Sequence, residues 1–244
     1  MKALVLTEYN HFEIQEVEKP VCPPDEVLIK IEACGICGSD VHGMDGSTGR
    51  RQPPMIMGHE ASGTIVEVGS EVQGYTVGER VTFDSTVYCG SCAFCQAGDI
   101  NLCNNRRVVG VSCDEYKSAG AFAEYLPLPP RVLYKFGNNL DFAKACMVEP
   151  LSIAFHAVNI TDIKLVNSVV VIGAGIIGQM VVQAVRLAGV AKLIVVDLDD
   201  DRLAKSCKHG ADYGLNSSKV DVVSEDGLKD NEIGRNISRS ALLI

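Results

Sequence analysis

The sequence predicts a two-domain α/β protein, in which a small antiparallel β domain precedes a parallel unit of alternating strands and helices. Residues 2–135 contain several short strand patterns separated by glycine turns, which favours a barrel-like β domain. After residue 166 a continuous apolar strand leads through a glycine-rich turn into a helix, a pattern typical of a parallel α/β unit. A chain of 244 residues is long enough to form both.

The composition excludes several kinds of partner and compartment. The net charge is −9, the pI is near 5.0 and there is no basic stripe, so we expect neither nucleic acid nor a membrane as partner. Met1–Leu6 is too short an apolar run for a signal peptide, and no run reaches the roughly 18 to 20 apolar residues that cross a bilayer. We therefore expect a cytoplasmic protein. In a reducing compartment the ten cysteines, four of them clustered, favour metal binding over disulfides.

The first domain is expected to consist of short strands followed by a helical segment. Alternating or apolar runs predict strands at 2–7, 27–33, 63–68, 80–84, 121–126 and 132–135. Helical patterning runs from Asp141 to Asn159 with a break at Pro150. We place the domain boundary there and assign residues 1–150 and 151–244 to the two domains.

The second domain shows the pattern of a nucleotide-binding sheet. The order is a buried strand (167–172), a glycine turn (173–178), a helix (176–188), a strand (192–196), a helix (199–209) and a possible third strand at Tyr213. The pattern decays from Val220, and residues 224–244 show no convincing periodicity. Because a doubly wound nucleotide domain usually has five or six strands, we expect the chain to stop within this domain.

A four-cysteine lobe is predicted between residues 89 and 103. Its cysteines are separated by two, two and seven residues, and the short spacings let consecutive thiolates surround one ion. Four thiolates leave no open position for a substrate, so we predict a structural zinc. An iron–sulfur cluster is less favoured because Asn104, and not proline, follows the fourth cysteine. The four ligands are Cys89, Cys92, Cys95 and Cys103.

A second metal centre, with an open position, is predicted from Cys37 and His59, which stand at the ends of predicted strands. A catalytic zinc takes three protein ligands and leaves the fourth position to water or substrate. The candidates for the third ligand are Glu60 and Glu149, and the residues alone leave that choice open. Judged singly, Glu149 could instead start a helix and Glu60 could be solvated.

The glycine turn predicts a nucleotide site. Gly173, Gly175 and Gly178 follow a buried strand and open a helix, the context in which this motif binds a pyrophosphate. Asp197 ends the next strand and is placed to accept hydrogen bonds from the adenine ribose. A 2′-phosphate would meet like charge there, so we predict NAD rather than NADP. The acidic residues that follow Asp197 could simply cap the next helix, and both roles are compatible.

In these motifs the chain resembles the zinc-dependent medium-chain alcohol and polyol dehydrogenases, particularly the sorbitol dehydrogenase-like branch. The matching pieces are Cys37–His42, Gly58–Glu60, the four-cysteine lobe, Glu149–Leu151 and Gly173–Gly178, in the family's order over residues 1 to about 216. The resemblance implies a GroES-like β-barrel-type catalytic domain, a partial Rossmann NAD-binding domain, and two zinc ions per chain, one catalytic and one structural. It also implies a dimer or tetramer for the full-length family, whose members continue well past residue 244.

The resemblance also assigns roles to single residues. It implies that Cys37, His59 and one or both of Glu60 and Glu149 bind the catalytic zinc. It implies a proton relay from the alcohol through Ser39 toward His42, which suits a hydroxyl and an imidazole. The residues expected to contact the cofactor are Gly173, Gly175, Ile176, Ile177, Gly178, Asp197 and Arg202.

The expected function is therefore the zinc- and NAD-dependent oxidation of a secondary alcohol to a ketone by hydride transfer. The substrate is a polyol such as sorbitol, or a sugar-alcohol phosphate if Arg50 and Arg51 meet a phosphate; a solvated loop is the alternative for these arginines. Two other hypotheses compete with this function. The chain could be an inactive truncated fragment that keeps its zinc sites, or a zinc-binding regulatory or redox-sensing relic of such an enzyme.

Overall fold

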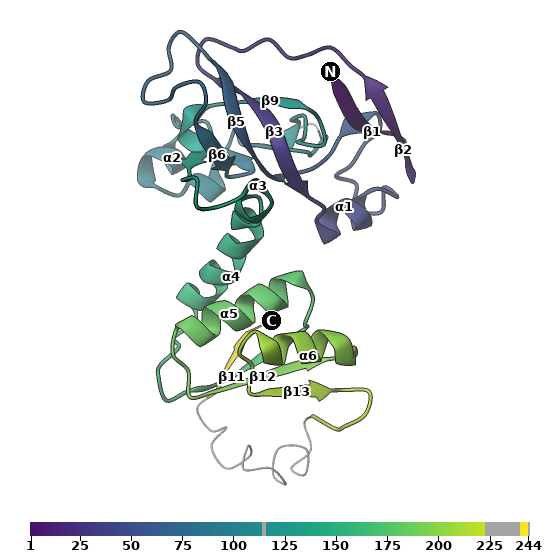
Figure 1. The fold of residues 1–244 in the computed structure, drawn as a ribbon, viewed down its shortest axis with the longest axis vertical. Coiled ribbons are helices and arrows are strands. Elements are labelled where there is room, and N and C mark those ends of the chain that lie inside the picture. The colour runs from purple at the N-terminus through teal and green to yellow at the C-terminus, as the bar shows by residue number, and fades with distance from the viewer. Residues whose placement is uncertain (114–115, 223–239, 244) are drawn as a thin grey trace. The chain divides into compact units, whose positions relative to one another are not determined.

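The computed structural model describes residues 1–113, 116–222 and 240–243. They divide into two compact units, Met1–Glu149 and Pro150–Ile244 (Figure 1). The division falls in the first turn of helix α4 (Val148–Ile160), and the sequence prediction placed the boundary at residue 150. None of the helices in the described residues combines the length and hydrophobicity of a membrane span.

The first unit consists mainly of antiparallel strands. They are β1 (Lys2–Glu8), β2 (His11–Glu16), β3 (Val27–Gly35), β4 (Met55–Ile56), β5 (Glu60–Val68), β6 (Arg80–Phe83), β7 (Thr86–Val87), β8 (Arg107–Val108), β9 (Tyr125–Leu128) and β10 (Leu133–Lys135). The main sheet has the order β10–β6–β5–β3–β9, a second has the order β2–β1–β4, and β7 pairs with β8. This is the GroES-like barrel-type domain that the sequence predicts.

Short helices connect these strands. They are α1 (Gly38–Gly43), α2 (Ala93–Ala97), η1 (Ile100–Leu102), η3 (Pro130–Val132) and α3 (Phe142–Ala145). A core cluster of the unit includes the fully buried side chains of Val27, Ile29, Ile65 and Val81. Burial of these side chains supplies the main driving force for folding of the unit.

The structure corrects two boundaries in this unit. Pro150 does not break the helix, because it lies in the first turn of α4, where its missing N–H costs no hydrogen bond. The interruption comes earlier, between α3 and α4. The strand expected at 121–126 begins only at Tyr125, whereas Ala123 makes an isolated bridge to Ala3.

The second unit is a parallel sheet with helices. Its elements are β11 (Ser168–Ile172), α5 (Ile176–Leu187), β12 (Lys192–Asp197), α6 (Asp200–Lys208), β13 (Tyr213–Asn216) and β14 (Ser240–Leu243). The strand order is β13–β12–β11–β14, and α5 and α6 cover one face of the sheet (Figure 1). This is a Rossmann-type arrangement. The strand β14 was not predicted, and residues 223–239 lie outside the described part of the chain.

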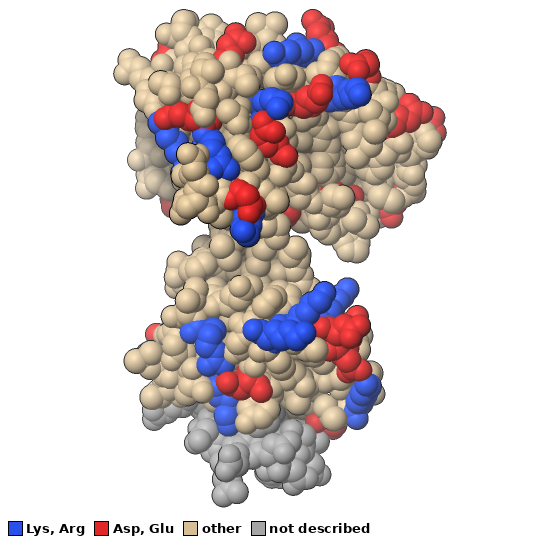
Figure 2. Space-filling model, in the orientation of Figure 1, with Lys and Arg blue, Asp and Glu red and all other residues tan. Residues whose placement is uncertain are grey.

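Charged side chains of both signs are interspersed on each unit over the face drawn in Figure 2. On that face no single sign of charge dominates, in agreement with the absence of a basic stripe in the sequence.

Candidate functional site

The pairing of β3 with β5 brings the predicted metal ligands together. The two strands are antiparallel, and the register places Gly35 at the end of β3 opposite Glu60 at the start of β5. Cys37 follows the first strand, and His59 immediately precedes the second. One ligand atom from each of Cys37, His59 and Glu60 therefore lies within 4.8 Å of the others.

The short helix α1 holds two of these residues through one carboxylate. Cys37 is the residue that precedes α1, and its backbone N–H donates to Asp40 Oδ2 at 3.1 Å. The other oxygen, Asp40 Oδ1, lies 3.5 Å from His59 Nδ1. Asp40 thus contacts both predicted ligands. Because Asp40 lies at Nδ1 of His59, the other ring nitrogen, Nε2, is the one directed toward the cluster.

Glu60 is held in a buried position over Gly35. Its exposed fraction is 4%, and a Cβ atom added at Gly35 would stand 2.5 Å from Glu60 Oε2. A side chain at position 35 would therefore displace the Glu60 carboxylate from its present position. The side chain of Glu60 is thus not the solvated one that a single-residue interpretation suggests.

Glu149 is near this cluster but is held by another residue. Its Oε1 accepts a hydrogen bond from the buried Ser85 Oγ at 3.0 Å, and it is not in the group of atoms that lie within 4.8 Å of one another. Burial raises the pKa of Glu149, and the carboxylate of Glu60 adds to this rise. Between the two candidates for the third ligand, the structure brings Glu60 to Cys37 and His59.

The electrostatics of the Cys37–His59–Glu60 cluster suit a cation. Burial raises the pKa of the Cys37 thiol. Burial alone would lower the pKa of His59, but the carboxylates of Asp40, Glu149 and Glu60 outweigh it and raise that pKa. His59 Nδ1 and Asp40 Oδ1 are buried and have no hydrogen-bond partner among the described residues. A sulfur, a nitrogen and an oxygen donor at one point form a set that zinc accepts, with the fourth position left open.

The two residues of the predicted proton relay lie on α1. Ser39 Oγ is exposed and lies 3.5 Å from His59 Nε2, so it sits at the edge of the metal cluster. His42 is exposed three residues further along the helix, on the same side as Ser39. Their contribution to proton transfer stays a prediction.

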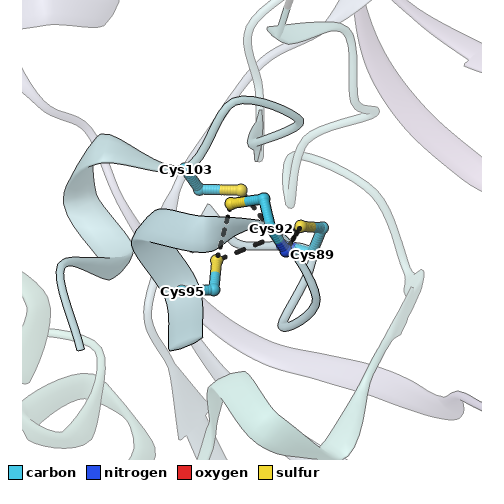
Figure 3. A group of neighbouring side chains, drawn as sticks. All are labelled: Cys89, Cys92, Cys95 and Cys103. Atoms are coloured by element: carbon cyan, nitrogen blue, oxygen red, sulfur yellow. Dashed lines mark hydrogen bonds between the residues drawn. The ribbon is translucent and has the colours of Figure 1, made fainter. Parts of the chain in front are cut away.

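The four cysteines of the lobe converge as one donor set (Figure 3). Cys92 Sγ and Cys95 Sγ are 3.5 Å apart, and Cys89 Sγ and Cys95 Sγ are 4.0 Å apart. A disulfide needs sulfurs about 2.05 Å apart. The edge of a tetrahedron with metal–sulfur bonds of 2.3 Å is about 3.8 Å. The observed distances therefore fit four thiolates around one zinc ion.

Backbone N–H groups in this lobe donate hydrogen bonds that stabilise a negatively charged thiolate. Cys89 Sγ accepts from the N–H groups of Ser91 and Cys92, at 3.5 and 3.4 Å, and the N–H of Ser91 is the main reason why the pKa of Cys89 is lowered to about 5. Burial raises the pKa of Cys95 to about 12. In the absence of a cation, the four thiols cannot all ionise at such short distances.

The glycine turn of the second unit has the geometry that its motif predicts. Gly173 has φ of 94°, in the left-handed region, and Gly175 is the residue that precedes α5. Asp197, the last residue of β12, is hydrogen-bonded to the glycine turn: its Oδ2 accepts a hydrogen bond from the N–H of Ala174 at 2.6 Å. Its Oδ1 accepts from the N–H groups of Leu198 and Asp199, so the carboxylate is held rigidly.

Asp197 and Asp199 have different hydrogen-bond partners. Asp199 caps α6 by accepting from the N–H groups of Asp201 and Arg202, whereas Asp197 faces the turn. The Arg202 guanidinium lies 3.8 Å from Asp199 Oδ2. Ile176 and Ile177 are exposed at the start of α5, beside the turn. Cofactor contact by these residues stays a prediction.

The sequence did not indicate that Asp40, Ser85 and Arg51 support the Cys37–His59–Glu60 site or the neighbouring Glu149. Asp40 could have been found, because it is the third residue of a helix that begins directly after Cys37. Ser85 and Arg51 reach the site through tertiary contacts that no local pattern reveals. The alternative of a solvated loop is wrong for Arg51, because its side chain is buried beside Asp40, with an exposed fraction of 5% for the residue. This contact with a carboxylate does not favour a phosphate at Arg51.

A substitution in the glycine turn should separate stability from nucleotide binding. A Cβ atom at Gly178 would collide with the carbonyl oxygen of Gly173, whereas a Cβ at Gly175 meets no atom within 4 Å. We expect Gly178→Ala to lower the free energy of unfolding of the second unit by about 1–3 kcal/mol. Gly175→Ala is the matched control and should leave that free energy unchanged while weakening NADH binding. Urea unfolding and NADH fluorescence measure the two effects, and equal stability of the two variants would contradict the close contact.

The hydrogen bonds to Asp197 predict a pH dependence. The N–H of Ala174 holds the pKa of Asp197 below its ordinary value of 3.8. A carboxylate with a lowered folded-state pKa stabilises the fold above pH 3.8, and this stabilisation is lost as the pH falls through the folded-state pKa. Hydrogen exchange in β12 should therefore be slower in the wild type than in Asp197→Asn at neutral pH. The difference should disappear in acid, and a pH-independent difference would contradict it.

An antiparallel β domain that holds a Cys–His–Glu cluster, followed by a Rossmann-type unit with a glycine turn, is the arrangement found in zinc-type dehydrogenases. Comparison with known proteins supports this class of protein. The profile of the alcohol dehydrogenase GroES-like domain matches residues 23–138. Sorbitol dehydrogenase of Bacillus subtilis is 33% identical over 241 residues, which cover 98% of this chain and 67% of that protein. The chain belongs to the zinc-dependent medium-chain alcohol and polyol dehydrogenase family.

Solved structures share the fold. A zinc-binding dehydrogenase of Sinorhizobium meliloti bound to NADP superposes with a TM-score of 0.84 at 36% identity, over 91% of this chain and 63% of that one. An alcohol dehydrogenase of Escherichia coli complexed with NADH gives 0.85 at 35% identity, over 94% and 66%. The chain spans 61% and 64% of the lengths of the first two curated relatives that it matches.

Proposed function

We propose that this chain carries the zinc- and NAD-dependent site of a dehydrogenase that oxidises a secondary alcohol of a polyol to the ketone. The observation that carries the proposal is the meeting of Cys37, His59 and Glu60 within 4.8 Å. A second zinc in the four-cysteine lobe would have a structural role. The assembly of the protein as a homo-oligomer and its location in the cytoplasm belong to the same proposal.

The site residues of the first unit would have separate roles in zinc binding and proton transfer. Cys37, His59 and Glu60 would hold the zinc, which as a Lewis acid lowers the pKa of an alcohol hydroxyl in the open position. Ser39, exposed beside His59 Nε2, would accept the proton of the substrate hydroxyl. His42, three residues along α1, would receive a proton from Ser39 and deliver it to water.

NAD is the proposed coenzyme because of Asp197. Its pKa is lowered, so the carboxylate is charged at neutral pH where the adenine ribose is expected to bind. A 2′-phosphate would be repelled there, whereas ribose hydroxyls could donate to it. Similar proteins have been solved with NADP and with NADH, so the choice of NAD rests on this carboxylate.

A polyol without a phosphate is the favoured substrate. Arg50 and Arg51 are the two residues that could bind the phosphate of a sugar-alcohol phosphate, and Arg51 is buried against Asp40. Arg50 alone is exposed. One exposed arginine is weak support for a phosphate site.

Two measurements on the purified chain test the proposal. Elemental analysis should give two zinc ions per chain, and the absorbance of NADH should rise when NAD and a polyol are supplied. A panel of sorbitol, butanediol, threonine and galactitol 1-phosphate would identify the substrate class. Two zinc ions without NADH formation would support the inactive-fragment hypothesis. Loss of zinc on reversible cysteine oxidation, with altered binding of a partner, would support the redox-sensing one.

A further inference from the structure

The two neighbouring arginines that follow α1 are in opposite environments. Arg50 is exposed, whereas Arg51 has an exposed fraction of only 5%. Arginine is almost never fully buried unless it is paired, because desolvation of its charge is costly. The burial of Arg51 therefore calls for an explanation in terms of what its guanidinium contacts.

The partner of Arg51 is the carboxylate that orients the metal ligands. Arg51 Nη2 lies 3.7 Å from Asp40 Oδ1, and this same oxygen lies 3.5 Å from His59 Nδ1. The second oxygen of Asp40 accepts from the N–H of Cys37. Asp40 has an exposed fraction of 3%, so one buried carboxylate contacts two predicted ligands and one arginine.

The fold makes space for this arginine. Gly43 is the last residue of α1, and a Cβ atom added there would stand 2.6 Å from Arg51 Cγ. The φ angle of Gly43 is not in the left-handed region, so the backbone does not require glycine at this position. Glycine is needed there because the side chain of Arg51 passes close to the helix.

From this arrangement we propose that Arg51 is a positioning residue of the Cys37–His59–Glu60 metal centre. Its guanidinium neutralises Asp40 and thereby keeps that carboxylate between Cys37 and His59. In the absence of the guanidinium, Asp40 would be a buried charge without its cationic partner, and it would withdraw from His59. Lysine is a poor replacement, because a point charge on a flexible stem does not reproduce the planar fork of a guanidinium.

The inference rests on the proposed metal site, and zinc affinity tests it independently of catalysis. Zinc occupancy of the purified chain is measured in solutions buffered to graded free zinc, with the four-cysteine site as an internal reference for folding. We expect Arg51→Met to weaken the Cys37–His59–Glu60 site about 10- to 100-fold, as substitutions of residues that orient ligands do. Arg51→Lys should recover part of the loss. Arg50→Met is the matched control and should change nothing.

A second pair of variants tests the contact itself. Gly43→Ala should weaken the same site, because it displaces the Arg51 side chain. In the background of Arg51→Ala, Gly43→Ala should have no further effect, since the atom that it displaces is gone. The cobalt(II) absorption spectrum should report the same changes, because it depends on the geometry of the ligands.

The outcomes distinguish this inference from the proposed function. If the wild-type chain binds no zinc at Cys37, His59 and Glu60, the proposed catalytic site itself is wrong, and the inference falls with it. If the wild type binds zinc there and Arg51→Met binds it equally tightly, the positioning role alone is wrong. Additive effects of the substitutions at positions 43 and 51 would also overturn it. Should Arg51→Met lose the four-cysteine site as well, the Gly43→Ala pair decides.

Discussion

Glu60→Gln should remove zinc from the Cys37–His59–Glu60 site, whereas Glu149→Gln should leave it bound. The carboxylate of Glu60 lies within 4.8 Å of the other two donor atoms, and the absence of a side chain at Gly35 gives it room. Glu149 instead accepts a hydrogen bond from Ser85. We expect Glu60→Gln to cost more than about 100-fold in zinc affinity, the upper end of the effect of residues that only orient ligands. We expect Glu149→Gln to cost less than about 10-fold.

Zinc titration of the two variants in buffered zinc measures the difference. Both replacements keep the shape of the side chain and remove its charge, so each serves as the control for the other. Ser85→Ala adds a third test, because it removes the Ser85 hydrogen bond to Glu149 without altering the proposed ligands. If Glu149→Gln loses zinc as completely as Glu60→Gln does, then Glu149 is a direct ligand as well.

Cys103→Ser should release the zinc of the four-cysteine lobe and unfold the lobe. The helix α2 spans only Ala93–Ala97 and buries none of its residues, and Phe94 and Leu102 are exposed. So short a helix is unstable in water by itself. Because the lobe has almost no apolar core, a bound metal ion would be the main force that orders it. In zinc-finger peptides such a site contributes about 10–16 kcal/mol, which is an upper bound for this lobe.

The effect should be local and measurable. Zinc content should fall by one ion per chain, and residues 89–103 should lose protection against hydrogen exchange and proteases, while β3 and β5 keep theirs. Cys207→Ser, an exposed cysteine of the second unit, is the control and should change neither quantity. Persistent protection of the lobe in zinc-free Cys103→Ser would show that its fold does not depend on the metal.

Most of the fold could be predicted from local patterns. The strands β1, β3, β5, β11 and β12 and the helices α5 and α6 were all expected within three residues of their observed bounds. Their apolar residues repeat with the period of a strand or a helix over a whole element. The short strands β2, β4, β7 and β8 were missed, because two to six residues carry little periodic signal and are stabilised by the neighbours with which they pair.

The burial of the cysteines outside the two predicted metal sites could not be predicted from residue type alone. Cys22, Cys34, Cys113, Cys146 and Cys207 belong to neither predicted metal site, and residue type alone favours buried or half-buried positions for all five. Cys146 is buried, but Cys207 is exposed on α6. Residue type gives an average burial, and the face of a helix on which a residue falls decides the individual case.

The sequence by itself determined the four-cysteine site and the glycine turn, because both are contained in one short segment. Spacings of two residues bring thiolates to one ion whatever surrounds them, and a glycine turn between a strand and a helix carries its own geometry. Only the tertiary structure showed that Glu60 lies within 4.8 Å of Cys37 and His59 and that Arg51 is buried whereas Arg50 is exposed. These placements depend on the register of β3 against β5 and on the space beside Gly43. Such contacts join residues whose separation along the chain says nothing about their distance in space.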